Sequence, residues 1–313
     1  MSQLDRIDPE SRLPLEEMLA EYHGGICSLT DLSERRAIGA RRTAEARAAV
    51  GPHPRVSAED LVVPGADIPV RVFRPASAEP DAPGIFFIHS GGMIVGSIDG
   101  EAEQAELLAD ELGAVVVSVG YRLAPEHPHP AQSDDCFAAY TWMATHAGEL
   151  GFDPARLAIY GGSAGGNLAI ATALLARDRG GPAPVFVCAP YPMLDETNTS
   201  ASSLAITAVG LWDRQPNIDA WAHFLGGREA DAYASPLKAD LAGLPPMFID
   251  VGDVDLFRDE DLELVRKLLE AGVVVEFHLW PGAYHGSEWM APDAPLSKRI
   301  LAARLAALRR ALA

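Results

Sequence analysis

A serine between glycines is the residue of this sequence best suited to nucleophilic chemistry. Residues 161–165 read Gly-Gly-Ser-Ala-Gly; they follow the apolar run Leu157–Tyr160 and open a helical stretch, Ala164–Arg177. Small flanking residues let a strand and a helix approach closely at a strained turn, which exposes the serine hydroxyl at the helix N-terminus. Because both the strand and the helix are expected here, the pattern G-x-S-x-G predicts that Ser163 is a nucleophile.

A second glycine-rich turn could stabilise the negative charge that develops on an attacked carbonyl oxygen. The strand-like run Ile85–Ile88 leads directly into residues 89–93, His-Ser-Gly-Gly-Met. Backbone N–H groups in such a loop can donate to an oxyanion, and Ala164, directly after the serine, can supply another donor. Gly-Gly also occurs in ordinary turns, so the loop indicates an oxyanion hole only in combination with the serine motif.

A base and an orienting carboxylate must accompany a serine nucleophile, and after G-x-S-x-G they are expected in the order Asp or Glu, then His. His285 follows the last strand-like run, where its side chain could reach back over the sheet edge. His89 precedes the nucleophile and is expected to orient the glycine loop. His127 and His129 lie among prolines without a third ligand, so a structural loop is favoured over a metal pair.

The orienting acid is expected in the stretch from residue 250 to residue 260. Asp250 falls within a strand-like run, while Asp259 and Glu260 fit the first turn of a helix, where negative charge is favourable. Asp253 and Asp255 both remain as candidates from the residues alone.

The elements that must position these groups alternate between short apolar runs and longer amphipathic stretches, which predicts a mostly parallel eight-stranded sheet with helices on both faces. Residues 51–313 are expected to form this catalytic domain. Residues 1–50 are helical in composition, and residues 193–230 form a long excursion, so we expect both to cover one end of the sheet. The predicted strands are Val56–Val63, Ile68–Phe73, Ile85–Ile88, Val115–Val119, Leu157–Tyr160, Val185–Cys188, Met247–Val251 and Val273–Leu279. The predicted helices of the domain are Glu101–Leu112, Ser133–His146, Ala164–Arg177, Arg258–Ala271 and Ser297–Ala313.

Composition excludes several classes of function. The 313 residues carry a formal net charge of −19, which disfavours nucleic acid and anionic membranes as partners. The three cysteines lack the paired spacing of a zinc or redox site and are expected to be reduced. The first residues carry no signal-peptide pattern and no window is apolar enough to span a membrane, so a soluble cytoplasmic protein is expected.

Five ordered segments resemble the bacterial hormone-sensitive-lipase-like carboxylesterases, a family of the α/β-hydrolase fold. Residues 89–93 resemble its H-G-G-G loop, and residues 121–128 read Y-R-L-A-P-E-H-P as in the family. Residues 161–169 resemble G-D-S-A-G-G-N-L-A, residues 255–260 resemble D-P-L-R-D-E, and residues 285–286 match its H-G. The resemblance covers nearly all of the chain after residue 50.

The resemblance implies roles for individual residues. It makes Asp255, rather than Asp253, the acid of a catalytic triad with Ser163 and His285. It places the oxyanion hole at Gly91, Gly92 and Ala164, and it implies a two-part helical cap made of residues 1–50 and 193–230.

Two positions depart from the family motifs. Ser90 replaces the first glycine of the H-G-G-G loop, which places a hydroxyl beside the oxyanion hole. Gly162 replaces the common aspartate before the nucleophile, which removes a carboxylate from the turn without removing the chemistry.

The expected activity is hydrolysis of short to medium acyl esters through an acyl-enzyme, without a metal or organic cofactor. Met93, Leu211 and Trp212 are expected to line the substrate pocket, and the substrate is a small ester. A lactone, aryl-formamide or other amide hydrolase with the same triad is the alternative among enzymes, and a non-catalytic small-molecule receptor is the alternative from another class. A homodimer is compatible with the sequence.

Overall fold

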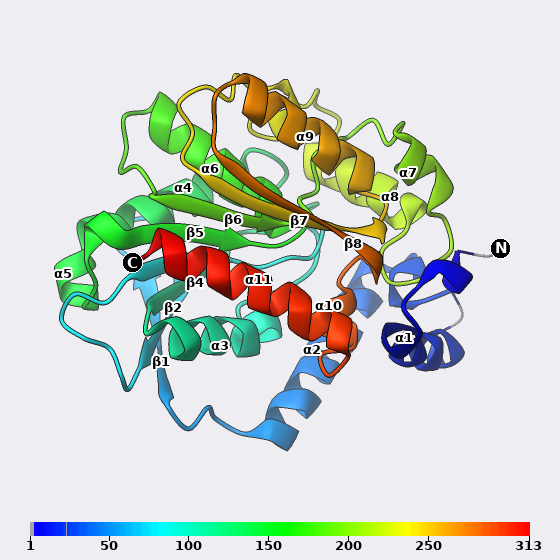
Figure 1. Cartoon of the computed structure of the whole chain (residues 1–313), viewed down its shortest axis with the longest axis horizontal. Helices are drawn as coiled ribbons and strands as arrows, with labels where there is room; N and C mark the ends of the chain where they lie inside the picture. The colour runs from blue at the N-terminus through cyan, green and yellow to red at the C-terminus, as the bar shows by residue number, and fades with distance from the viewer. Residues whose placement is uncertain (1–2, 23) are drawn as a thin grey trace.

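A twisted eight-stranded sheet forms the centre of the computed structural model, which describes residues 3–22 and 24–313 (Figure 1). The strand order is β1-β2-β4-β3-β5-β6-β7-β8. The pairs β1–β2 and β2–β4 are antiparallel, and all other neighbouring pairs are parallel. The strands are β1 (Val56–Val63), β2 (Ile68–Pro75), β3 (Gly84–Ile88), β4 (Val115–Val119), β5 (Leu157–Gly161), β6 (Phe186–Pro190), β7 (Met247–Val254) and β8 (Val275–Tyr284).

Helices cover both faces of this sheet. Alternation along the inner strands sends Phe86 and Ile88 of β3 into one core layer and Ile85 and Phe87 into the other. The first layer packs against α4, α6 and α9, and the second packs against α3 and α11. The helices are α1 (Pro9–Glu21), α2 (Leu32–Val50), α3 (Ala102–Leu112), α4 (Ala131–Thr145), α5 (Ala147–Leu150), α6 (Ala164–Asp178), α7 (Ala201–Ala205), α8 (Arg214–Leu225), α9 (Arg258–Glu270), α10 (Ser287–Met290) and α11 (Pro295–Ala311).

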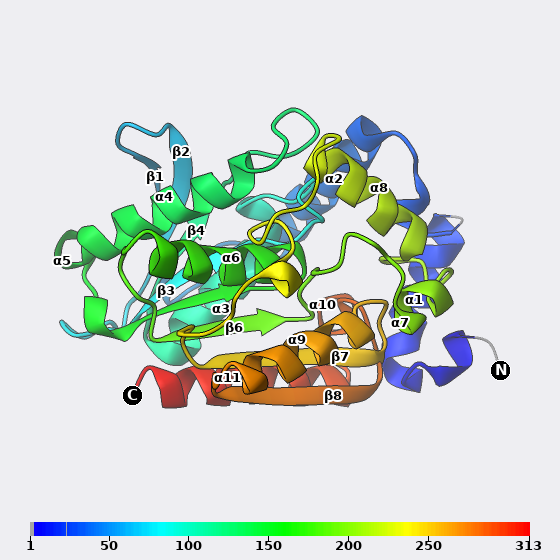
Figure 2. The same cartoon turned by 90° about the horizontal axis from the view of Figure 1, so that it is seen from above.

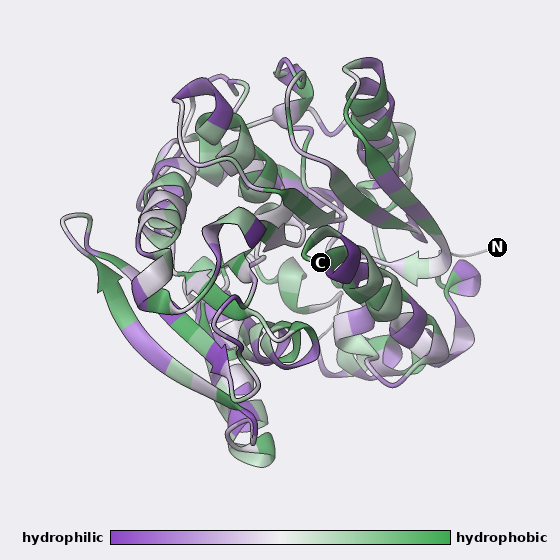
Figure 3. Cartoon of the chain, turned by 60° about the vertical axis from the view of Figure 1, so that its left-hand side comes forward, coloured by the Kyte–Doolittle hydropathy of each residue, from purple (hydrophilic) through white to green (hydrophobic). Residues whose placement is uncertain are grey.

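Burial explains why the inner strands read as continuous apolar runs. Every residue of β3, β4, β5 and β6 is buried, as expected for strands covered on both faces. The edge strand β1 instead is buried only at its two ends, Val56 and Val63, and is mostly exposed between them. Figure 3 shows the same contrast, with hydrophobic residues concentrated on the inner strands and hydrophilic residues on the outer faces of the helices.

The N-terminal helices and the excursion after β6 lie on the same side of the molecule. Figure 2 shows α1 and α2 beside α7 and α8, beyond the ends of the strands β6 and β7. The two segments touch directly: the backbone N–H of Ala208 donates to Gln3 Oε1 at 3.4 Å, and the Arg35 guanidinium lies 5.9 Å from the centre of the Trp212 ring. Residues far apart in the chain therefore meet at the carboxyl ends of the parallel strands.

The predicted eight-stranded, mostly parallel sheet with helices on both faces is confirmed, with one informative shift. The prediction ended a strand at Val251, whereas β7 continues to Val254. A register irregularity between Gly252 and Val254 lets β7 stay paired with β8 over this extension. Asp253 consequently belongs to the strand, while Asp255 lies just beyond it. Among the described residues, no helix is long and apolar enough to cross a membrane.

Candidate active site

Ser163 lies at the sharp turn between β5 and α6. Its backbone has φ 55° and ψ −120°, a conformation that costs an ordinary residue on the order of 1–3 kcal/mol and is found at functional sites. The turn closes this tightly because Gly161 and Gly165 lack side chains: a Cβ on Gly161 would lie 2.3 Å from the carbonyl oxygen of Gly165, and a Cβ on Gly165 would lie 2.2 Å from that of Ile88. Gly161 and Gly165, two residues before and two residues after the serine, are therefore required sterically.

Three side chains from separate parts of the chain form one hydrogen-bonded row. His285 Nε2 lies 2.9 Å from Ser163 Oγ, and His285 Nδ1 lies 2.9 Å from Asp255 Oδ2. The other carboxylate oxygen of Asp255 accepts the backbone N–H of Phe257 at 2.9 Å, which fixes the orientation of the carboxylate. Ser163 is 4% exposed and Asp255 is 1% exposed, so the row is shielded from bulk water. In this arrangement the imidazole can take a proton from the hydroxyl while its other nitrogen donates to the carboxylate.

The competing acid, Asp253, faces different partners. Its Oδ1 accepts the backbone N–H of Gly282 at 2.7 Å, and its Oδ2 pairs with Arg6 at 2.9 Å. Asp253 thereby ties the end of β7 to β8 and to the N-terminal segment. The structure brings Asp255, and not Asp253, to the imidazole.

The glycine loop after β3 has a conformation that suits glycine. Gly91 and Gly92 have φ of 112° and 59°, where a side chain would be strained. A Cβ on Gly91 would lie 2.2 Å from the carbonyl oxygen of Val95. The Gly91 carbonyl accepts the N–H groups of Ile94 and Val95 at 3.0 and 2.9 Å, which folds the loop back on itself beside the nucleophile turn.

His89 and Tyr121 fix the base of this loop. The two rings stack with centroids 4.1 Å apart, and the Tyr121 hydroxyl donates to the carbonyl oxygen of His89 at 3.0 Å. His89 is 1% exposed, and burial lowers its pKa to about 4, so the imidazole stays neutral at physiological pH. His89 therefore supports the glycine loop. Of the two histidines, His285 is the one that contacts Ser163.

The two departures from the family motifs are neighbours in space. Ser90 Oγ donates to the carbonyl oxygen of Gly162 at 3.1 Å, and the Ser90 backbone N–H donates to Glu101 Oε1 at 2.7 Å. Burial raises the pKa of Glu101 to about 7, although the Ser90 N–H works in the opposite direction. Ser90 therefore links the glycine loop to the nucleophile turn and to a carboxyl group that titrates near neutrality.

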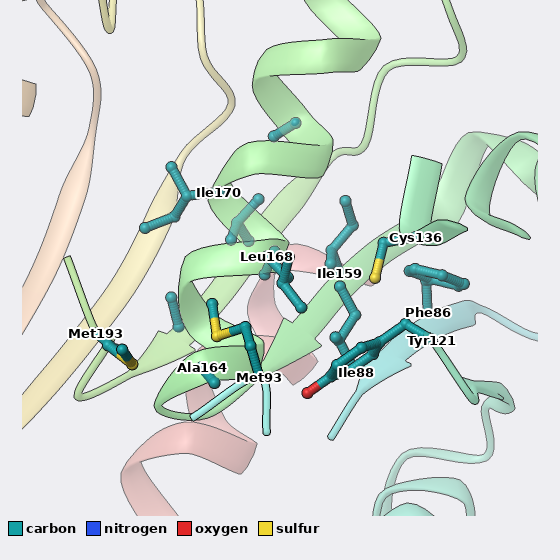
Figure 4. Packing of buried hydrophobic residues seen from close by; sticks show 14 of the residues in the cluster. Phe86, Ile88, Met93, Tyr121, Cys136, Ile159, Ala164, Leu168, Ile170 and Met193 are labelled. Carbon is teal, nitrogen blue, oxygen red and sulfur yellow. The ribbon is translucent and has the colours of Figure 1, made fainter. Parts of the chain in front are cut away.

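The residues expected to line a pocket take three different positions. Met93 is fully buried and, as Figure 4 shows, lies in the core beside Ala164 and Leu168. Leu211 is partly buried. It approaches Gly286, the residue after His285, because a Cβ on Gly286 would lie 3.3 Å from Leu211 Cδ2. Trp212 covers the glycine loop, because a Cβ on Gly92 would lie 2.5 Å from its ring. Leu211 and Trp212 thus border the reacting groups from the excursion side, and Met93 lies beneath them.

The turn that carries Leu211 and Trp212 is held by Asp213. Its Oδ1 accepts the N–H of Val209 at 2.8 Å, and its Oδ2 accepts the N–H of Gly210 at 2.7 Å. A hollow of about 230 Å³ lies nearby between the N-terminal segment and α8. It is lined by Leu29, Thr30, Leu32, Arg35, Ile94, Asp219, Ala222 and His223. Ile94 directly follows the glycine loop, but none of Ser163, Asp255 and His285 lines this hollow.

Sequence reasoning missed the side chains that support the row from behind. Tyr191 contacts the ring of His285, Tyr121 contacts the glycine loop, and Glu101 accepts a hydrogen bond from Ser90. None of the three is part of the G-x-S-x-G pattern. Tyr191 follows directly after β6, and the carboxyl end of a central parallel strand is where site residues gather. That position was the one available signal for Tyr191. Among residues 3–22 and 24–313, no group of three or more His, Cys, Asp or Glu side chains is arranged to hold a metal ion.

Comparison with known proteins supports one family. A sequence model of the α/β-hydrolase fold matches residues 85–288. Carboxylesterase NlhH of Mycobacterium tuberculosis is 40% identical over 253 residues, which span 79% of each chain. Esterase LipI of the same organism is 35% identical over 82% of this chain and 83% of its own length.

Solved structures agree with the sequence relatives. A bacterial heroin esterase superposes with a TM-score of 0.92 at 35% identity and covers 100% of both chains. An esterase of the bacterial hormone-sensitive lipase family superposes with a TM-score of 0.84 at 28% identity, over 98% of this chain and 99% of that one. The chain belongs to the bacterial hormone-sensitive-lipase-like carboxylesterases of the α/β-hydrolase fold and is an ester-hydrolysing enzyme.

Proposed function

We propose that this enzyme hydrolyses short to medium acyl esters by two-step acyl transfer, with Ser163, His285 and Asp255 as its catalytic triad. The observation that carries the proposal is the pair of 2.9 Å contacts that join Ser163 Oγ to His285 Nε2 and His285 Nδ1 to Asp255 Oδ2. This geometry fits a nucleophile, a general base and an orienting carboxylate.

In the first step, Ser163 Oγ attacks the ester carbonyl carbon while His285 Nε2 takes the hydroxyl proton. Asp255 accepts the hydrogen bond from Nδ1–H and stabilises the imidazolium that forms. The tetrahedral oxyanion then collapses as the C–O bond to the alcohol breaks, and His285 returns the proton to the departing alkoxide. The acyl group remains on Ser163.

In the second step, water attacks the acyl-enzyme and gives its proton to His285. The carboxylic acid leaves when the bond to Ser163 Oγ breaks and the proton returns to the serine. We assign stabilisation of both oxyanions to the backbone N–H groups of Gly91, Gly92 and Ala164, each worth on the order of 10²- to 10³-fold in rate. The positive φ values of Gly91 and Gly92 and the position of Ala164 at the start of α6 support this assignment.

Residues 1–50 and 193–230 are proposed to act as a two-part cap, and residues 51–313 without that excursion as the catalytic domain. The direct contacts between the two segments support one continuous roof. We propose Leu211 and Trp212 as pocket walls and Met93 as a buried floor residue, since Trp212 covers Gly92 and Leu211 approaches Gly286.

The test compares Ser163→Ala with Ser118→Ala on p-nitrophenyl butyrate. Ser118 is a buried serine of β4 whose hydroxyl lacks a hydrogen-bond partner among the described residues, so it controls for removal of a buried hydroxyl. Ester hydrolysis should disappear in Ser163→Ala and persist in Ser118→Ala, with both variants folded by circular dichroism. Faster turnover of a lactone or an aryl amide than of the ester by the parent enzyme would reassign the substrate class.

A further inference from the structure

Tyr191 contacts the imidazole of His285 although it lies outside the hydrogen-bonded row. The two ring centroids are 4.7 Å apart with an interplanar angle of 63°. Phe257 approaches the same imidazole with a centroid distance of 4.9 Å and an angle of 89°. His285 therefore has two aromatic neighbours in edge-to-face contact in addition to its two hydrogen bonds, a geometry that favours one ring orientation.

Tyr191 is itself held by a chain of buried charged groups. Its hydroxyl donates to Glu288 Oε1, and Arg304 Nη1 donates to the same oxygen at 2.5 Å. Arg304 also donates to both oxygens of Asp250, through Nε at 2.8 Å and Nη2 at 2.9 Å. Arg304 is 3% exposed and Asp250 is fully buried, so these charges depend on one another for compensation.

The backbone and the ring face of Tyr191 are fixed by the same groups. The Tyr191 N–H donates to the carbonyl oxygen of Asp250 at 2.6 Å, and the Arg304 guanidinium lies 5.1 Å from the centre of the Tyr191 ring. Tyr191 has φ 34°, a strained value that surrounding contacts must maintain. Although burial opposes it, the contacts with Arg304 and Tyr191 keep the pKa of Glu288 below its ordinary value, so Glu288 is a charged acceptor at neutral pH.

Tyr191 also borders the turn that carries the nucleophile. A Cβ on Gly162 would lie 3.3 Å from Tyr191 Cε2 and 3.6 Å from its hydroxyl oxygen. The space beside residue 162 is thus occupied by Tyr191 instead of by a side chain of that residue. One side chain therefore touches both the base and the residue before the nucleophile.

We propose that Tyr191 is a positioning residue that keeps the imidazole of His285 aligned with Ser163, and that Glu288, Arg304 and Asp250 form the buried support that keeps Tyr191 in place. The inference rests on the proposed esterase mechanism. A small displacement of the base lowers the rate of proton transfer without weakening substrate binding. Loss of the support should therefore lower kcat while KM stays nearly constant.

The experiment measures kcat and KM on p-nitrophenyl butyrate for Tyr191→Ala, Tyr191→Phe, Glu288→Gln and the double variant Tyr191→Phe/Glu288→Gln. Tyr284→Phe is the matched control, because the buried Tyr284 hydroxyl donates to the Ser11 carbonyl oxygen at 3.0 Å instead of to Glu288. Thermal unfolding of each variant is recorded alongside, so that loss of stability and loss of alignment are measured separately.

Tyr191→Ala should lower kcat on the order of 100-fold with little change in KM, as expected for a misplaced catalytic group. Tyr191→Phe keeps the ring edge and should retain kcat within about tenfold. Tyr191→Phe removes the hydroxyl that donates to Glu288, and Glu288→Gln removes the charge of its acceptor. Because both changes weaken the same hydrogen bond, the double variant should be no slower than the slower single variant. Tyr284→Phe should keep kcat within about twofold of the parent value.

Two results would overturn the inference: a Tyr191→Ala kcat within about twofold of the parent value, or losses in the double variant that multiply. If Tyr191→Ala does not fold, the cycle of Phe and Gln variants decides the question alone. Ser163→Ala is assayed in parallel. Activity retained in Ser163→Ala would refute the proposed mechanism, whereas an inactive Ser163→Ala beside an unaffected Tyr191→Ala would refute only the positioning role.

Discussion

The hydroxyl of Ser90 donates a 3.1 Å hydrogen bond to the carbonyl oxygen of Gly162, the residue before the nucleophile. This contact joins the glycine loop to the nucleophile turn through the two residues that depart from the family motifs. The backbone N–H of Ser90 is a separate donor and binds Glu101. The two departures are therefore parts of one local arrangement.

Ser90→Gly should change kcat modestly, within about tenfold or ~1.4 kcal/mol, because the proposed oxyanion donors are backbone groups of other residues. Stability should fall by about 1 kcal/mol as one hydrogen bond is lost. Steady-state kinetics and thermal unfolding measure both effects. A decrease in kcat of the ~10² to 10³ seen for a lost oxyanion donor would show that the Ser90 hydroxyl itself donates to the oxyanion.

Asp255→Asn should lower kcat by about 10⁴, the magnitude reported for the corresponding change in a serine protease, because an amide stabilises the wrong imidazole tautomer. Asp253→Asn is the matched control: it should weaken the contacts with Gly282 and Arg6 and leave kcat within a few-fold. The ratio of the two kcat values on one ester is the measurement. If kcat falls by a similar factor in both variants, Asp255 is not the carboxylate that orients His285.

The stability of the enzyme should depend on the ionisation of Glu101. Its pKa is raised from 4.5 to about 7 by burial, so between these values the folded state binds more protons than the unfolded state. Stability from this group is therefore present at low pH and is lost as pH rises through that window. Glu101→Gln keeps an acceptor for the Ser90 N–H and removes the titration.

The Glu101 prediction is tested by thermal unfolding of parent and variant from about pH 5 to about pH 8. The difference in Tm should shift in favour of Glu101→Gln as the pH rises and then level off. A difference that stays constant across the series would mean that Glu101 has an ordinary pKa in the folded enzyme.

Acyl-chain preference should be limited by the excursion after β6. Each buried methylene contributes about 0.8 kcal/mol, so kcat/KM should rise with chain length up to about four to eight carbons and then fall. Trp212→Ala should move the maximum to longer esters, because the ring that covers Gly92 is removed. The exposed Trp289 provides the control, Trp289→Ala. A maximum at long-chain esters with interfacial activation in the parent would instead indicate a lipase.

The order of elements and the nucleophile turn could be predicted because both depend on local sequence. Buried strands read as apolar runs, and the G-x-S-x-G turn admits only glycine at positions 161 and 165 for steric reasons. The choice between Asp253 and Asp255 could not be made from the residues alone. It depends on the irregular pairing of β7 with β8, which carries Asp253 into the strand and leaves Asp255 to face His285.

Tertiary contacts account for what the sequence did not predict. Met93 was expected to line the pocket; the structure buries its side chain completely, so its place as a floor residue stays a proposal. Tyr191 and Arg304 lie far apart in the chain, so nothing local links them to His285. Only the assembled sheet, with α11 packed on one face, brings Arg304 to Glu288 and Tyr191.

The central claim, that Ser163 is the nucleophile, is tested most directly by a covalent label. The parent enzyme is inactivated with a p-nitrophenyl alkylphosphonate, the released p-nitrophenolate is counted, and the modified peptide is identified by mass spectrometry. The mechanism predicts release stoichiometric with enzyme, an adduct on Ser163, and loss of esterase activity in proportion to labelling. An adduct on another residue, or full activity after Ser163 is labelled, would contradict it.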